Sequence, residues 1–200
     1  MKPKMRRTLL VSFGIGTALT CVFSSNVVRG ASPNSLSEIE RQLNRKTQVP
    51  VMLPNRLPKP AQVKRSKRVS RLHPSVSEAG ADRYSVNLEL LPDCDGATAC
   101  NWGSIRGRQL GRQAPPLKSE IQYKGMTPKR KCANTQQRSI ELAGGKRGYF
   151  FPSVLFASCT DSKIVWDSNG HRYTVGVKGG SFQQVKALAN RVIRNSSGRR

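Results

Sequence analysis

The stretch that decides the fold is SKIVWDSNGHRYTVGVK, residues 162–178, together with the helical pattern that follows it. Apolar and polar residues alternate on both sides of Asn169-Gly170, a dipeptide that favours a tight hairpin turn because both residues tolerate positive φ. Over residues 181–195 apolar side chains recur every three or four positions, and Ser181 with Gln184 forms a capping box. The stretch therefore predicts a β-hairpin followed by an amphipathic helix.

Further strand patterns precede this hairpin. Tyr84, Val86 and Leu88 alternate with polar residues, which is typical of a half-buried strand. Residues 147–157 are rich in aromatics and are expected to be the most buried, with Pro152 indicating an edge or a bulge. We expect a loop over 106–116 and strands at 83–91, after Cys100, and at 117–124, 137–143, 147–157, 163–166 and 172–177. Residues 83–200 are thus predicted to be an α+β domain, a twisted antiparallel sheet with the C-terminal helix packed on one face.

The first thirty residues resemble an export signal. The basic sequence MKPKMRR leads into the apolar residues 8–23, a run that is short for a membrane span and is followed by small and polar residues. Cleavage after Ser24 or after Gly30 fits this pattern, and lipid attachment at Cys21 or retention as an N-terminal anchor are alternatives. We therefore expect residues 1–30 to be a signal peptide and the protein to be periplasmic, cell-surface or secreted.

Four cysteines follow the signal: Cys94, Cys100, Cys132 and Cys159. An even number of cysteines in an oxidising compartment predicts disulfides, and three pairings are possible. Pairing of the first with the second and of the third with the fourth is favoured, because it closes one tight loop and ties two distant segments. A zinc site is the alternative, but metal sites usually contain a close CxxC pair, which this sequence lacks.

Residues 31–54 are predicted to form a short helix and an extended segment. Leu36, Ile39 and Leu43 make one apolar stripe behind a capping box that begins at Ser35. The apolar run that follows contains two prolines. It is expected to lie at a sheet edge, since proline cannot donate to a central ladder.

Residues 55–82 combine prolines with a dense basic charge and are predicted to be a disordered linker. The whole chain has 35 Lys and Arg against 11 Asp and Glu, a net charge of +24 that favours binding to polyanions. The linker is either a solvated spacer or a docking arm for a polyanion. In the second case the binding residues are Lys64, Arg65, Lys67, Arg68 and Arg71.

Four segments resemble a family of uncharacterised exported proteins from cyanobacteria: TQVPVMLP (47–54), CDGATACNWGSIRG (94–107), GYF (148–150) and CTDSKIVWDSNGHRY (159–173). The hairpin with its terminal helix also resembles small extracytoplasmic domains appended to bacterial membrane proteins. The resemblance covers about Leu36–Leu57 and Tyr84–Asn195. It implies export, disulfides and an α+β fold, and it implies no catalytic residue.

Sequence patterns of an active site are weak. The two histidines are His73, in the linker, and His171, beside a turn. The sequence from Asp93 to Gly96 begins like a calcium loop but lacks the later ligands. P-loop and Gly-x-Ser-x-Gly motifs are also missing. We therefore predict no catalytic residue, no bound metal and no cofactor.

These patterns together predict a non-enzymatic binding module at the cell envelope that is attracted to polyanions. The expected partner is an anionic polysaccharide or an anionic membrane surface. Specific nucleic-acid recognition is not expected, because aromatic residues make up only 6% of the chain and most of them occupy strand positions suited to a core. An envelope hydrolase or its inhibitor, and an extracellular DNA-binding protein, are the alternatives.

Overall fold

The computed structural model describes residues 35–60, 71–92, 94, 99–121, 130–132, 136–156 and 158–198. They all belong to one compact unit, Ala31–Arg200. The predicted signal peptide lies outside the described residues, and so do four of the five predicted polyanion-binding residues, namely Lys64, Arg65, Lys67 and Arg68.

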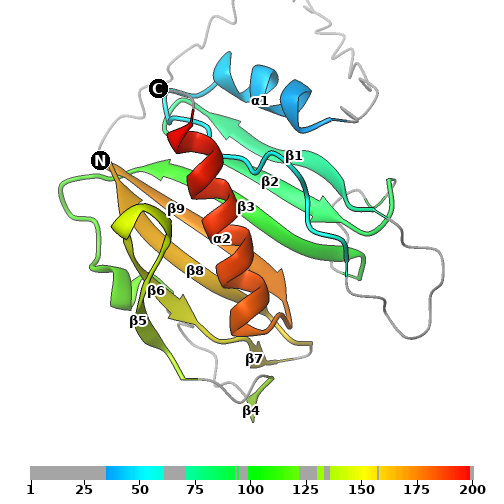
Figure 1. The fold of residues 1–200 in the computed structure, drawn as a ribbon, viewed down its shortest axis with the longest axis vertical. Helices are drawn as coiled ribbons and strands as arrows, with labels where there is room; N and C mark the ends of the chain where they lie inside the picture. Colours follow the sequence, from blue (N-terminus) through cyan, green and yellow to red (C-terminus); the bar gives the residue numbers. More distant parts are fainter. Residues whose placement is uncertain are drawn as a thin grey trace, which may run out of the picture. The chain divides into compact units, whose positions relative to one another are not determined.

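The centre of the fold is a seven-stranded antiparallel sheet in the order β1-β2-β3-β9-β8-β6-β5 (Figure 1). Its strands are β1 His73–Gly80, β2 Arg83–Glu89, β3 Asn101–Gln109, β5 Arg138–Glu141, β6 Arg147–Phe151, β8 Asp161–Ser168 and β9 His171–Lys178. A second, two-stranded sheet pairs β4 Arg130–Lys131 with β7 Val154–Leu155. The predicted α+β class, with an antiparallel sheet and a C-terminal helix on one face, is confirmed.

The hairpin between β8 and β9 forms as the sequence predicts. Asn169 and Gly170 both have positive φ, 51° and 75°, and Ser168 pairs with His171 across the turn. Pairing then continues to Asp161 and Lys178, so the two strands are aligned over their full length. This hairpin supplies two of the three central strands of the sheet.

The C-terminal helix α2, Phe182–Ser197, lies across β8 and β9 (Figure 1). Its predicted capping box is present. The backbone N–H of Gln184 donates to Oγ of Ser181 at 3.3 Å, and the Ser181 N–H donates to Oε1 of Gln184 at 2.8 Å. One face of the helix is buried, comprising Val185, Leu188, Ala189, Val192 and Ile193.

Replacing Ser181 with Ala removes this cap, and we expect the free energy of unfolding to fall by about 1 kcal/mol. Urea denaturation followed by circular dichroism measures the change. The matched control is Ser197→Ala at the other end of α2, where the exposed hydroxyl donates only to the carbonyl of Ile193. The control should change stability by less than about 0.5 kcal/mol. An equal effect of both substitutions would contradict the capping argument.

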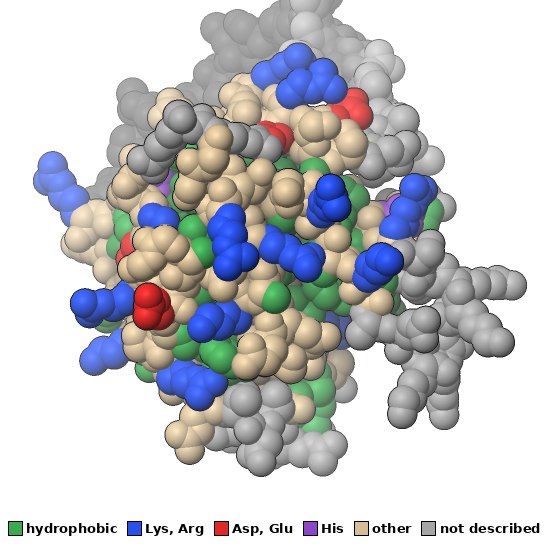
Figure 2. Space-filling model, in the orientation of Figure 1, with side chains coloured by type: hydrophobic (Ala, Val, Ile, Leu, Met, Phe, Trp, Pro, Cys, Tyr) green, Lys and Arg blue, Asp and Glu red, His purple; other side chains and the backbone are tan. Residues whose placement is uncertain are grey.

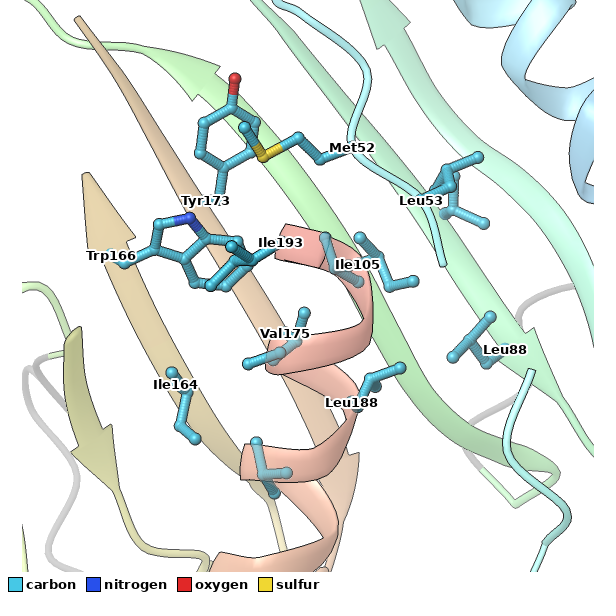
Figure 3. Close-up of a cluster of buried hydrophobic side chains, with 14 of the residues drawn as sticks. Met52, Leu53, Leu88, Ile105, Ile164, Trp166, Tyr173, Val175, Leu188 and Ile193 are labelled. Carbon is cyan, nitrogen blue, oxygen red and sulfur yellow. The ribbon is translucent and has the colours of Figure 1, made fainter. Parts of the chain in front are cut away.

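The core lies between α2 and the sheet and extends to the N-terminal segments. Figure 3 shows Leu188 and Ile193 of α2 beside Ile105 and Trp166 of the sheet, with Met52 from the segment before β1. Helix α1, Leu36–Asn44, adds two fully buried side chains to the same cluster. The predicted short helix is therefore present, and it belongs to the domain core.

The segment over residues 47–60 forms no strand, so the prediction that the extended residues 47–54 lie at a sheet edge is wrong. It crosses the face of the sheet that carries both helices (Figure 1). Its backbone is held by side chains: the Met52 N–H donates to Oη of Tyr84 at 2.9 Å, and Nδ2 of Asn195 donates to the Leu53 carbonyl at 2.8 Å. Side-chain partners thus replace the ladder that the two prolines would interrupt.

The predicted linker over residues 55–82 also requires correction, because His73–Gly80 forms β1. This strand is at the sheet edge, where Pro74 is tolerated because one side of the strand needs no ladder donor. Val76 lies opposite Val86 and contributes an apolar side chain to the core. The sheet therefore begins about ten residues earlier than the sequence indicates.

Two predictions between β3 and β5 are wrong. β3 continues to Gln109, through part of the predicted loop, and the predicted strand from residue 117 begins instead as a 3₁₀ turn, Leu117–Ser119. The turn follows Pro115-Pro116, which cannot supply ladder N–H groups. The residues on either side of this turn, Pro115 and Glu120, accept hydrogen bonds from Arg172.

Candidate polyanion-binding surface

The four predicted cysteines form two disulfides, Cys94–Cys100 and Cys132–Cys159. Their Cα atoms are 6.1 and 6.0 Å apart, within the ordinary range for a disulfide. The favoured pairing is confirmed, and the zinc alternative is wrong for these cysteines. Disulfides of this kind indicate an oxidising, non-cytoplasmic compartment.

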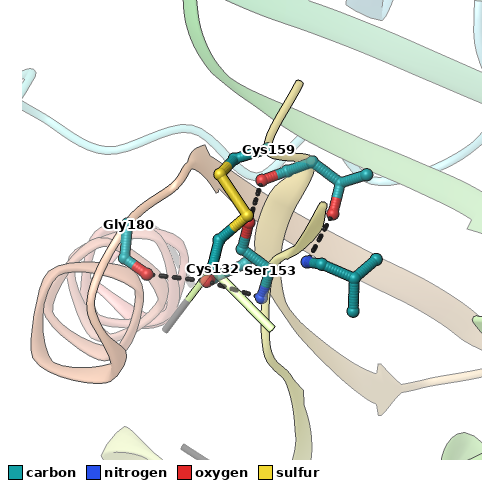
Figure 4. The surroundings of a disulfide bond; sticks show 7 residues. Cys132, Ser153, Cys159 and Gly180 are labelled. Atoms are coloured by element: carbon teal, nitrogen blue, oxygen red, sulfur yellow. Dashed lines mark hydrogen bonds between the residues drawn. A yellow bond between two sulfur atoms is a disulfide. The ribbon is translucent and has the colours of Figure 1, made fainter. Parts of the chain in front are cut away.

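The second disulfide lies in a hydrogen-bonded region that also reaches the start of α2 (Figure 4). The Cys132 N–H donates to the Ser153 carbonyl at 3.0 Å, and the Ser153 N–H donates to Oγ of Ser162 at 3.0 Å. Oγ of Ser162 in turn donates to the Gly180 carbonyl at 2.6 Å. Since both serines are fully buried, this network connects the small sheet firmly to β8 and to the residue before the α2 cap.

The helix-bearing face of the domain is basic. Figure 2 shows many Lys and Arg side chains on this face and few acidic ones. Helix α2 itself contains Lys186, Arg191 and Arg194 and no acidic residue. The two arginines are exposed and the lysine is half-buried, all outside the buried stripe. The sequence places these three cations correctly on the solvent side of the helix.

An aromatic ring lies beside Lys186 at the start of the helix. The guanidinium of Arg138, on β5, is 4.3 Å from the centroid of the Phe182 ring, and Nζ of Lys186 is 5.8 Å from it. The ring also contacts Phe150 edge to face, with centroids 5.1 Å apart. We call Arg138, Lys186, Arg191 and Arg194 the α2 basic surface. A half-buried ring between two cations offers both charge and a flat apolar contact.

The sequence did not indicate the role of Arg138, because that residue is 44 positions from Phe182 and meets it only through the sheet order. The alternation of polar and apolar residues over 137–143 indicated only in part where Arg138 would lie. Arg138 and the buried Ile140 share one side of β5, the side that faces α2.

Of the predicted polyanion-binding residues, only Arg71 is described. It is exposed and lies two residues before the start of β1. The two histidines weighed as catalytic residues lie on β1 (His73) and at the start of β9 (His171), and β2 and β3 separate them. Within the described ranges, no three His, Cys, Asp or Glu side chains are grouped as metal ligands.

An ion-pair network around the buried Arg172 lies on the opposite face of the sheet. Arg172 of β9 is 3% exposed, and its Nε and Nη2 donate to the Asp167 carboxylate at 2.7 and 2.9 Å. Its Nη1 donates to Glu120 and to the Pro115 carbonyl, both at 2.6 Å. Nη2 of Arg108 donates to the same Glu120 carboxylate at 2.9 Å. Hydrogen bonds to Asp167 raise the pKa of Arg172 further, despite burial. The network holds the loop after β3 against the sheet.

The described residues thus define a disulfide-stabilised α+β domain with a basic helix-bearing face. Comparisons with protein-family models, with curated proteins and with solved structures found no match. Neither helix in the described part of the chain has the length and apolar character needed to cross a membrane.

Proposed function

We propose that this protein is an exported, non-enzymatic binding module that attaches to polyanions of the cell envelope. The observation that carries this proposal is the α2 basic surface. Helix α2 has three cations outside its buried face and no acidic residue, and Arg138 and Lys186 lie over the Phe182 ring. The partner is an anionic polysaccharide or an anionic membrane surface, as the sequence predicts. Membership of the exported cyanobacterial family stays a prediction of the sequence resemblance.

The arrangement of charge supports surface attachment. Like charges near one another raise the local positive potential, so each cation gains attraction to a partner that presents repeated negative groups. The described acidic side chains at Asp167 and Glu120 are engaged by arginines on the other face of the sheet and do not neutralise this surface. Attachment of this type should be rapid, weakly selective and sensitive to salt.

Removing three of these charges should weaken attachment strongly. The variant carries Lys186→Gln, Arg191→Gln and Arg194→Gln in oxidised Ala31–Arg200. Since each cation near an anionic membrane contributes about 1 kcal/mol, binding to vesicles containing phosphatidylserine or phosphatidylglycerol should be roughly 100-fold weaker. Vesicle co-sedimentation at two salt concentrations measures the effect, and an acidic polysaccharide column provides the second probe.

The matched control removes the same charge from other exposed positions, with Arg112→Gln, Lys118→Gln and Arg147→Gln. Its binding should stay within about threefold of the parent, allowing for the loss of long-range attraction. A further variant with Gln at positions 64, 65, 67, 68 and 71 tests the predicted basic arm separately. If the control and the α2 variant lose affinity equally, only net charge matters and the α2 basic surface is not a binding site. Binding to duplex DNA that exceeds binding to both other probes would favour the extracellular DNA-binding alternative.

A further inference from the structure

One arginine of the α2 basic surface is held in place by the core. The guanidinium of Arg138 lies over the Phe182 ring, 4.3 Å from its centroid. This ring contacts Phe150 edge to face, and Phe150 is fully buried and directly opposite Arg138 in the β5–β6 register. The ring therefore rests on a rigid part of the domain. A guanidinium placed over such a ring is preorganised, so it loses little freedom when its N–H groups bind a partner.

A second cation lies near the same ring, and neither cation is neutralised. Nζ of Lys186 is 5.8 Å from the Phe182 centroid. Among the residues that the structure describes, neither Arg138 nor Lys186 forms an ion pair with a carboxylate. Two like charges beside one ring repel each other, so an anionic group that contacts both of them is favoured. The planar fork of Arg138 can donate to such a group through two N–H groups at once.

The cations of the α2 basic surface follow the helix. Lys186 and Arg194 are about 12 Å apart along the helix axis, at a rise of 1.5 Å per residue, and Arg191 lies between them in the sequence. Arg138 stands at the beginning of this row, because it lies over Phe182, the first residue of α2. Figure 2 shows basic side chains spread over this face of the molecule. A row of cations is complementary to a chain that carries negative groups at intervals.

The same face offers no apolar side chain for insertion into a membrane. The apolar residues of α2 are buried against the sheet, and Phe182 is half-buried with Arg138 over its ring. Among the described residues, Leu91 is the exposed large apolar side chain, at 51%, and it follows β2 rather than belonging to α2. A helix that lies in a membrane interface instead turns its apolar face into the lipid. The arrangement therefore favours a polysaccharide over a membrane surface.

On the basis of the function proposed above, we propose that the partner of the α2 basic surface is a linear acidic polysaccharide. Arg138 and Lys186, placed at the Phe182 ring, bind one of its carboxylate or sulfate groups, with Arg138 as the residue that recognises the shape of the group. Arg191 and Arg194 attract the following negative groups of the chain by charge alone. Recognition at Arg138 therefore depends on the guanidinium fork as well as on its charge.

Arg138→Lys keeps the charge but removes the fork, so it separates recognition from attraction. In oxidised Ala31–Arg200 it should weaken binding to alginate, which carries carboxylates, or to dextran sulfate at least about fivefold. The slope of log affinity against log salt should stay unchanged, because the number of charges is the same. Titration calorimetry at several salt concentrations measures both quantities. Arg147→Lys, at an exposed arginine of the neighbouring strand β6, is the matched control and should bind like the parent.

Phe182→Leu tests whether the ring positions Arg138. It should weaken polysaccharide binding similarly but add little to Arg138→Lys, because both changes act at one contact. Fully additive losses would show that the ring does not position the arginine.

Vesicles containing phosphatidylglycerol, compared with both polysaccharides at equal concentrations of negative groups, test the choice of partner. The parent should bind a polysaccharide more tightly than the vesicles. Tighter binding to vesicles, or parent-like binding of both polysaccharides by Arg138→Lys, would overturn the proposal. The proposed function would then still stand if removal of the charges at Lys186, Arg191 and Arg194 weakened attachment. A parent that bound neither polysaccharides nor vesicles would overturn both.

Discussion

Replacing Arg172 with Met lowers the expected free energy of unfolding by about 3–5 kcal/mol, the largest effect of any single side chain considered. The physical reason is that Met fills a similar volume but leaves the Asp167 and Glu120 carboxylates without their buried guanidinium partner. The Pro115 carbonyl loses its donor as well, so the loop after β3 should separate from the sheet. Urea denaturation at pH 7 measures the stability, and limited proteolysis of the loop measures its release.

Arg83→Met is the matched control, since this strand arginine also contacts two acids. Its partners are Asp82 and Glu78, but the side chains of all three are 54–56% exposed. An exposed pair contributes between about 0 and 1 kcal/mol because water solvates both charges almost as well as the partner does. The comparison of the two variants therefore measures how much the burial of Arg172 adds to the strength of its ion pairs. Similar losses in the two variants would mean that the Arg172 network contributes no more than an ordinary surface pair.

Removal of the Cys132–Cys159 disulfide, as Cys132→Ser with Cys159→Ser, should lower the free energy of unfolding by about 3.5 kcal/mol. This figure follows from the chain-entropy model, because the bond joins residues separated by 27 positions. Loss of the bond also frees the small β4–β7 sheet, which lies next to the buried serines that reach the start of α2. The measurement is denaturation of each variant under oxidising conditions.

The Cys94–Cys100 pair serves as the internal control. It closes a loop with a separation of only 6, so the same model predicts a loss of about 2 kcal/mol when both residues are changed to Ser. The expected order is therefore a larger loss for the longer loop. If the short-loop variant is the less stable of the two, unfolded-chain entropy is not the main source of stabilisation by these disulfides.

The surfaces proposed for binding depended on tertiary contacts to different degrees. The sequence alone placed Lys186, Arg191 and Arg194 outside the apolar stripe of the helix, because helical periodicity is local. It could not bring Arg138 to the Phe182 ring, since this contact needs the order of the strands and the crossing of α2.

The sequence by itself determined those elements of the structure that local interactions specify. The Asn169-Gly170 turn follows from backbone conformations that few other residues adopt, and the start of α2 follows from the Ser181 cap. The favoured disulfide pairing was inferred correctly from spacing, since the nearest cysteines close the least costly loop. These features require only neighbours in the chain, and such neighbours can be read from the order of residues.

Only the tertiary structure decided where the proline-containing segments lie and which charges are buried. Residues 47–60 cross the helix-bearing face because Tyr84 and Asn195 satisfy their backbone groups, and β1 forms because β2 offers it a partner edge. Arg172 looks like any other polar strand residue in the sequence, yet its side chain is buried and it binds Glu120, which is 52 residues away in the chain. The physical reason is the same in each case: the stabilising partner is distant in sequence, and it comes within reach only when the sheet has assembled.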